Sequence, residues 1–132
     1  MSRGPRPGGA PERWMLFTAD ACACCGSRDR LVRHHVCYRA HVRREGGDEW
    51  APANALALCT PCHEGFHARR VPVPLSVLRD GNVAFAADLL GGPAAFEYLT
   101  RRYAGTDPRV EALLVEPRLF TPGAPSAIGD AA

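Results

Sequence analysis

Cys59-Thr60-Pro61-Cys62-His63-Glu64-Gly65-Phe66-His67 (residues 59–67) joins a Cys-x-x-Cys pair to two histidines four residues apart. On a helix, side chains at this spacing lie on one face, one turn apart. His63 and His67 can therefore reach the same metal ion. A lone helical histidine is more often a surface or core residue, but a pair at this spacing beside two cysteines indicates metal ligands.

The residues around the histidine pair carry the signals of a helix start and a helix end. Thr60 is a favoured N-cap residue, and Pro61 stands at the first helical position, where proline is common. The Val71-Pro72 step disfavours helical backbone and marks the end. We therefore expect a helix over residues 61–70.

A second Cys-x-x-Cys pair, Cys22 and Cys25, lies upstream of the first pair, Cys59 and Cys62. Each pair is a short turn that can present two sulfurs to one ion, and the chain between the pairs is long enough to close a loop. Structural zinc sites use four such thiolates, arranged tetrahedrally at about 2.3 Å from the ion. We expect these four cysteines to hold a structural Zn²⁺.

Two further cysteines, Cys24 and Cys37, are left over. The run ACACCG (residues 21–26) allows Cys24 to replace Cys22 or Cys25 as a ligand. The pairing of Cys22 with Cys25 is preferred, because only this pair has two residues between its cysteines and a glycine after the second, which relaxes the turn.

Six cysteines in a short chain would also suit a secreted scaffold linked by disulfides. However, residues 1–10 (MSRGPRPGGA) lack the apolar core of a secretory signal, and no run of the sequence is long and apolar enough to cross a membrane. The expected location is the reducing cytoplasm of a bacterium or a phage-infected cell, where thiols bind metal in preference to forming disulfides.

A histidine doublet precedes the motif, and all five histidines of the chain lie between residues 34 and 67. Residues 31–37 (LVRHHVC) and 54–58 (NALAL) read as short strands, and the polar residues 38–50 as a loop with two glycines. Successive side chains of a strand point to opposite faces. His34 and His35 can thus serve one site only if the strand is irregular there or bordered by a wide turn.

The order of motifs in this chain resembles that of the HNH endonucleases of bacteria and phages. The order is a histidine doublet, an asparagine, the string Cys-Thr-Pro-Cys-His and a closing histidine. The match covers about residues 21–70. It implies an α+β fold: a small zinc-stabilised ββα-metal (His-Me finger) core with a four-cysteine zinc knuckle. It also implies an enzyme that hydrolyses DNA phosphodiester bonds, by nicking or cutting, and leaves 5′-phosphate and 3′-hydroxyl ends.

The resemblance to colicin-type members of this family also assigns roles to single residues. It implies that His35 is the general base that activates water. It also implies that Asn54 orients His35 by accepting a hydrogen bond from the imidazole N–H with its side-chain or backbone oxygen. The implied ligands of the catalytic metal are His34, His63 and His67. The chain departs from the family pattern in one respect: many members have aspartate where this chain has His34, and many lack the final histidine.

An all-imidazole site has a consequence for the metal. Imidazole suits transition metals, whereas Mg²⁺ prefers oxygen ligands. The expected catalytic ion is therefore Zn²⁺, Ni²⁺ or Mn²⁺ in preference to Mg²⁺. Three protein ligands leave a position open for a phosphate oxygen, as catalytic sites do. A free histidine with a pKa of about 6.5 can take the proton of the attacking water.

Positive charge accompanies the motif. Residues 1–70 hold eleven arginines against seven acidic residues, and residues 71–132 hold five against seven. All sixteen basic residues are arginine, which suits phosphate binding but equally a GC-rich genome. Contacts with the DNA backbone are expected from Arg43, Arg44, Arg69 and Arg70, although solvated surface charge explains any one of them as well.

One active site per chain favours nicking by a monomer, whereas cutting both strands needs a homodimer or two nicks.

The chain is expected to have four parts: a disordered basic arm (1–11), the nuclease domain with its structural zinc (12–72), a helical C-terminal extension packed on that core (73–116), and a flexible tail (117–132). The apolar residues 14–17 (WMLF) are expected to pack on the zinc module.

Within the C-terminal extension, apolar periodicity and Gly or Pro boundaries predict helices over residues 82–90, 93–103 and 107–114. Asp80-Gly81 can instead form the turn of a β-hairpin.

The alternative to a nuclease is a non-catalytic zinc-knuckle module that binds nucleic acid or protein. Such a module would keep the cysteines but would not need His35 or Asn54.

Overall fold

Two short strands, β1 (Leu31–His35) and β2 (Ala55–Cys59), pair antiparallel in the computed structural model of the chain, which describes residues 20–115. The register sets Leu31 opposite Cys59 and His35 opposite Ala55. All residues of β2 are buried, as its apolar sequence ALALC requires, whereas β1 buries only His34 completely. The predicted strands 31–37 and 54–58 are thus confirmed in place, with ends that differ by one or two residues.

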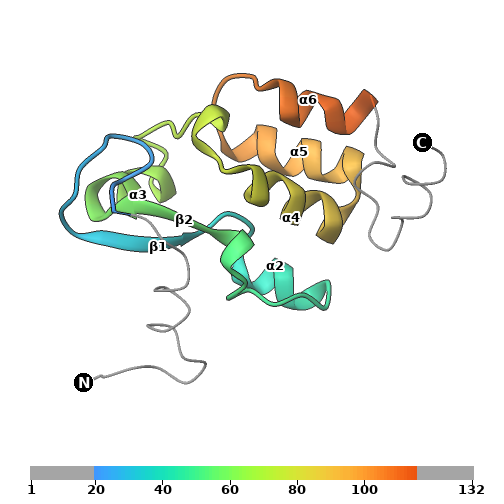
Figure 1. Cartoon of the computed structure of the whole chain (residues 1–132), viewed down its shortest axis with the longest axis horizontal. Coiled ribbons are helices and arrows are strands. Elements are labelled where there is room, and N and C mark those ends of the chain that lie inside the picture. The colour runs from blue at the N-terminus through green and yellow to red at the C-terminus, as the bar shows by residue number, and fades with distance from the viewer. Residues whose placement is uncertain (1–19, 116–132) are drawn as a thin grey trace. The chain divides into compact units, whose positions relative to one another are not determined.

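Helix α3 (Thr60–His67) follows β2 without a break and packs against both strands (Figure 1). Its N-cap is Cys59, so the prediction of Thr60 as N-cap is wrong. Thr60 instead lies in the first turn, where its backbone N and its hydroxyl both donate to the backbone oxygen of Arg30, at 2.8 and 3.1 Å. The start of α3 is therefore tied to the residue that precedes β1.

Helix α3 ends at His67, three residues before the predicted end. The cause is Arg69, whose φ of +61° lies in the left-handed region and stops the helix. The backbone N–H groups of Arg70 and Val71 then turn back and both donate to the backbone oxygen of Gly65, at 2.7 and 3.1 Å. The chain thus folds back onto the helix face that carries Gly65.

The backbone at Gly65 lies so close to Val71 that it leaves no room for a side chain. A Cβ at this position would overlap Cγ2 of Val71 and lie 2.9 Å from its Cβ. We expect Gly65→Ala to lower the free energy of unfolding by about 1–3 kcal/mol, because overpacking outweighs the better helix propensity of alanine. Equilibrium urea denaturation measures the change. Adding Val71→Ala should recover part of the loss; a Gly65→Ala protein as stable as the wild type would contradict the contact.

The segment between the strands is more ordered than predicted. It contains a six-residue helix, α2 (Arg39–Arg44), and a turn of 3-10 helix, η1 (Pro52–Asn54), where the sequence predicted a loop over residues 38–50. Helix α2 has one buried side chain, Val42, and its sequence RAHVRR carries no apolar periodicity. It depends on tertiary contacts, of Val42 with the core and of Arg39 and Arg43 with Glu49, which explains why the pattern did not predict it.

From Pro72 onward the described chain forms a second compact unit, separate from the unit that ends at Val71. It contains a 3-10 turn and three helices: η2 (Leu75–Val77), α4 (Asp80–Leu90), α5 (Gly92–Arg102) and α6 (Pro108–Val115). The three predicted helices are confirmed. Asp80-Gly81 forms the first turn of α4, so the alternative hairpin is wrong. Gly91, with φ +88°, makes the turn between α4 and α5.

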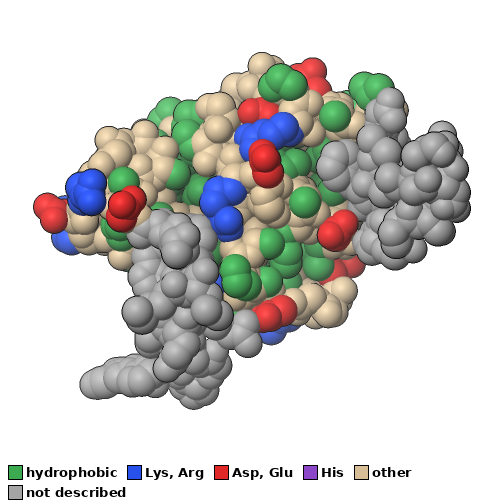
Figure 2. Space-filling view, in the orientation of Figure 1, with side chains coloured by type: hydrophobic (Ala, Val, Ile, Leu, Met, Phe, Trp, Pro, Cys, Tyr) green, Lys and Arg blue, Asp and Glu red, His purple; other side chains and the backbone are tan. Residues whose placement is uncertain are grey.

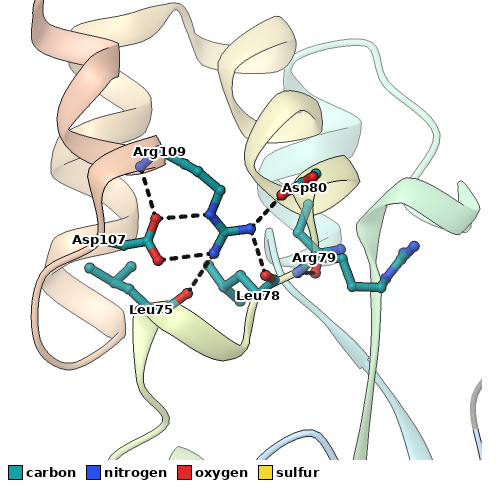
Figure 3. A network of polar contacts seen from close by, with 7 residues as sticks. Leu75, Leu78, Arg79, Asp80, Asp107 and Arg109 are labelled. Carbon is teal, nitrogen blue, oxygen red and sulfur yellow. Dashed lines mark hydrogen bonds and ion pairs between the residues drawn. The ribbon is translucent and has the colours of Figure 1, made fainter.

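Arg109 holds the second unit together at the start of α6 (Figure 3). Its guanidinium donates to both carboxylate oxygens of Asp107, at 2.8 and 3.1 Å. The same group binds the chain before α4 and its first residue, through Leu75 O, Leu78 O and Asp80 Oδ1. Hydrogen bonds from Arg109 hold the pKa of Asp107 below its usual value. This network has a structural task and lies outside the metal-binding motif.

Several predictions fall outside the described residues: the arm over residues 1–11, the packing of residues 14–17, and the tail over residues 117–132. Among the helices of residues 20–115, none has the length and apolar character needed to cross a bilayer.

Candidate metal centres

The four predicted zinc ligands lie together. One sulfur each from Cys22, Cys25, Cys59 and Cys62 falls within 4.8 Å of every other. Cys25 Sγ and Cys59 Sγ are 3.7 Å apart, far longer than the roughly 2.0 Å of a disulfide. The distance instead matches the edge of about 3.8 Å of a tetrahedron with Zn–S bonds of about 2.3 Å. The cluster can hold a structural zinc, and Cys24 is not part of it.

The backbone around the first pair explains how its sulfurs reach the second. Cys22 N donates to Ser27 O at 2.7 Å, and Gly26 N donates to Cys22 O at 2.9 Å, which closes a tight turn. Gly26 has φ +83°, the conformation for which glycine is suited. Ala23 N donates to Ala57 O at 2.8 Å, so the turn is attached to β2. The second pair needs no further device, because Cys59 ends β2 and Cys62 lies in the first turn of α3.

The protonation of the thiols reflects this crowding. Burial, and then the neighbouring thiols, raise the pKa of Cys62 well above its usual value. Burial also acts to raise the pKa of Cys22, but hydrogen bonds from backbone N–H groups and from the Cys25 thiol outweigh it and lower the pKa to about 6. The four sulfurs thus compete for negative charge. A divalent cation among them would allow all four to ionise.

The second cluster joins His34 of β1 to His63 and His67 of α3. One ring nitrogen of each lies within 4.8 Å of the others. The Nε2 atoms of His63 and His67 are 3.2 Å apart, which confirms that the i, i+4 spacing brings both rings to one point. His34 is buried, His63 half-buried and His67 exposed. These three imidazoles can hold a metal ion with one side open to solvent.

The two histidines of the doublet have different aromatic neighbours. Both residues are paired in register, but His35 is the last residue of β1 and a bend at residues 36–37 follows it, so the doublet lies where the strand meets a turn. His34 packs edge-on against Phe66 of α3, with ring centroids 5.0 Å apart. His35 packs edge-on against Trp50, with centroids 4.9 Å apart and an interplanar angle of 74°. His34 thus joins the helical histidines, while His35 stands outside the ligand cluster.

The pKa values of His34, His35 and His63 are shifted downward. Burial, and then the charges of His63 and His67, lower the pKa of His34 to about 3. Burial and then His67 lower the pKa of His63. Burial, followed by Arg33 and Arg39, lowers the pKa of His35 to about 4, so the expected unperturbed value of about 6.5 does not apply. These rings are neutral at neutral pH and have a lone pair available.

The Asn54 side chain forms hydrogen bonds with the backbone of Cys37 and Glu49. Its side-chain oxygen accepts from Cys37 N at 2.7 Å, and its side-chain nitrogen donates to Cys37 O and Glu49 O at 3.0 and 3.3 Å. Its backbone oxygen accepts from Val36 N at 2.9 Å. The expected hydrogen bond from the His35 ring to Asn54 is not among these contacts. Asn54, fully buried, instead fixes the chain that leaves β1.

The four arginines predicted to contact DNA differ in their surroundings. Arg43 Nη1 donates to Glu49 Oε2 at 2.7 Å, so its charge already has a carboxylate partner. Arg44, Arg69 and Arg70 are exposed. On the face that Figure 2 shows, arginine side chains lie beside acidic ones. The positive charge of the first seventy residues is therefore partly balanced locally.

Sequence reasoning missed three residues near His35: Arg39, Glu49 and Trp50. Arg39 Nε lies 3.6 Å from the Glu49 carboxylate, and the Arg39 guanidinium lies 5.0 Å from the centre of the Trp50 ring. The only local signal was a tryptophan directly before the Ala51-Pro52 turn in an otherwise polar segment. Their proximity to His35 depends on tertiary structure.

Comparison of the chain with protein-family models, with curated proteins and with solved structures gave no match. The assignment of function therefore rests on the residues of this chain and on their geometry.

Proposed function

We propose that this protein is a metal-dependent endonuclease of the HNH type that hydrolyses DNA phosphodiester bonds. The observation that carries the proposal is the convergence of three imidazoles from two elements, His34 on β1 and His63 and His67 on α3, beside a separate cluster of four sulfurs. A purely structural zinc module would need the sulfurs alone. The second cluster, half open to solvent, is what a catalytic site requires.

The two clusters suit different ions and different tasks. We propose Zn²⁺ for the four sulfurs, where it fastens the turn before β1 to the β2–α3 junction. For the imidazoles, the donor set favours Zn²⁺, Ni²⁺ or Mn²⁺ over Mg²⁺. When bound there, such an ion stabilises the negative charge that develops on the phosphoryl oxygens during hydrolysis.

In this proposal His35 takes the proton from the attacking water. His35 directly follows the proposed ligand His34 at the end of β1. Burial, and then Arg33 and Arg39, lower the pKa of His35; His63 is near enough to lower it further. Because His35 is not part of the ligand cluster, its nitrogen lone pair is free to accept a proton. Asn54 contributes indirectly, by holding the backbone that follows His35.

Incubation of supercoiled plasmid with the purified protein tests this function. We expect conversion to open-circular DNA when Mn²⁺, Ni²⁺ or Zn²⁺ is added, slower conversion with Mg²⁺, and none after chelation. The ratio of open-circular to linear product reports nicking against double-strand cutting. A plasmid that stays intact with every metal would contradict the proposal and favour a zinc-knuckle module that binds without chemistry.

Arg69 offers a test of the DNA contact that separates binding from stability. Its left-handed backbone costs a non-glycine residue about 1–2 kcal/mol. We expect Arg69→Gly to leave the free energy of unfolding unchanged or to raise it by up to about 1 kcal/mol, because relief of strain offsets the entropy of glycine. The same variant should bind DNA more weakly, with a salt dependence smaller by about one counterion.

Arg70→Gly is the matched control, because Arg70 does not have a positive φ. It removes the same charge without relieving strain, so its stability should fall while its DNA affinity falls as for Arg69→Gly. Fluorescence anisotropy with labelled duplex at several salt concentrations, combined with urea denaturation, measures both quantities. Unchanged DNA affinity for both variants would remove these arginines from the interface.

A further inference from the structure

We propose that Trp50 is the positioning residue for His35: its indole ring, and not the Asn54 amide, sets the orientation of the imidazole that accepts the proton. The inference rests on the proposed nuclease function and adds a residue to it. It concerns the contact that surrounds His35 at the end of β1.

The first observation is the ring contact itself. The His35 and Trp50 rings meet edge to face, with centroids 4.9 Å apart and planes 74° apart. This is the arrangement that aromatic pairs prefer, and it restricts rotation of the imidazole about its side-chain bonds. A flat, rigid neighbour at this distance therefore fixes the direction in which the ring nitrogens point.

The second observation is that hydrogen bonding does not fix the His35 ring. Its Nε2 atom is buried and has no hydrogen-bond partner within residues 20–115. The Asn54 side chain bonds to the backbone of Cys37 and Glu49. In the described structure, the ring contact with Trp50 is thus the contact that can orient this imidazole.

The third observation is that Trp50 is itself held firmly. Arg33 Nη2 donates to Trp50 O at 2.6 Å and to Ala51 O at 3.2 Å, which ties this segment to β1. Trp50 N donates to Asp48 Oδ1 at 2.9 Å.

Charge reinforces this attachment. The guanidinium groups of Arg33 and Arg39 lie 5.6 and 5.0 Å from the centre of the Trp50 ring, within cation–π range. A ring fixed by backbone hydrogen bonds and two cations can act as a rigid support for its neighbour.

The role predicts a particular kinetic signature. A misoriented base slows proton transfer without weakening the affinity for DNA. A displacement of about 1 Å can lower the rate about a hundredfold. We expect Trp50→Ala to lower the single-turnover nicking rate at saturating protein by about 10- to 100-fold, with the half-saturating protein concentration unchanged. Trp50→Phe keeps an aromatic ring and should recover most of the rate.

A double-variant comparison separates positioning from general damage. If Trp50 acts through His35, then Trp50→Ala should cause no further loss of rate in a His35→Ala background. A structural or DNA-stacking role would lower the rate, or raise the half-saturating concentration, in both backgrounds. Zinc content and melting temperature of every variant are measured alongside, and they should match the wild type.

NMR supplies a readout that does not depend on activity. A nuclear Overhauser contact between the ring protons of His35 and Trp50 is expected in the full-length wild type. The His35 ring protons should lose their ring-current shift in Trp50→Ala and keep most of it in Trp50→Phe. Wild-type nicking with an unaltered rate for Trp50→Ala, or absence of the ring contact, would overturn this inference alone. A wild type that never nicks DNA would overturn the proposed function and this inference with it.

Discussion

Replacing Cys62 by serine is expected to unfold the first unit and to release its zinc. The four sulfurs connect a turn before β1 with the junction of β2 and α3, and the described part of this unit otherwise consists of two short strands, two short helices and the turn η1. Structural zinc supplies about 10–16 kcal/mol to small domains, whereas folded proteins are stable by about 5–15 kcal/mol in total. Loss of one ligand therefore removes most of the stability of this unit.

Cys24→Ser is the matched control, since Cys24 lies within the same turn but outside the sulfur cluster. Metal analysis of the purified proteins and thermal melting by circular dichroism make the comparison. Cys24→Ser should keep one zinc per chain and melt as the wild type does. A Cys62→Ser protein that retains its zinc and its melting temperature would contradict the account of this site, and zinc loss by Cys24→Ser would make Cys24 a ligand.

Single alanine replacements at His63 and His35 are expected to stop or slow plasmid nicking for different reasons. His63 is the half-buried histidine of the cluster on α3 and a proposed ligand, so His63→Ala should lose the second metal ion and all nicking that depends on it. His35 lies outside the ligand cluster, so His35→Ala should keep that ion and lose about 10²- to 10⁴-fold in rate, the usual contribution of a general base.

His41→Ala is the control for this pair. His41 belongs to α2 and takes no part in the ligand cluster; its Nε2 lies 3.8 Å from the Glu45 carboxylate. Its replacement should change neither metal content nor nicking. If His35→Ala nicked DNA as fast as His41→Ala, His35 would not be the base. If His63→Ala kept both its second ion and its activity, the three imidazoles would not be the metal site.

The parts of the site that depend on local spacing were predicted correctly. Two Cys-x-x-Cys pairs and a histidine pair at i, i+4 fix which atoms can meet, and the structure brings both sets together. The α+β class, which the resemblance implied, and the three C-terminal helices, which the local pattern predicted, also agree with the structure. For the same reason the preferred pair Cys22 and Cys25 is the one found in the cluster.

The parts that depend on tertiary contacts were not predicted. Helix α2 has a single buried residue and therefore no periodic pattern. The partners of Asn54, on the backbone of Cys37 and Glu49, arise only when η1 meets the end of β1. The pKa of His35 is lowered by burial and then by the charges of Arg33 and Arg39. Neither the burial nor these neighbours can be predicted from the spacing of residues in the sequence.

We propose that one metal ion maintains the fold and a second one enables cleavage. The most direct test starts from protein that carries one tightly held zinc per chain and titrates Mn²⁺, Ni²⁺ or Zn²⁺ into it while plasmid nicking and bound metal are measured in the same samples. We expect no nicking at one ion per chain and an onset of nicking as a second ion binds. In His63→Ala, neither the second binding event nor nicking should occur. Full nicking by protein that holds a single ion, or by His63→Ala, would contradict this proposal.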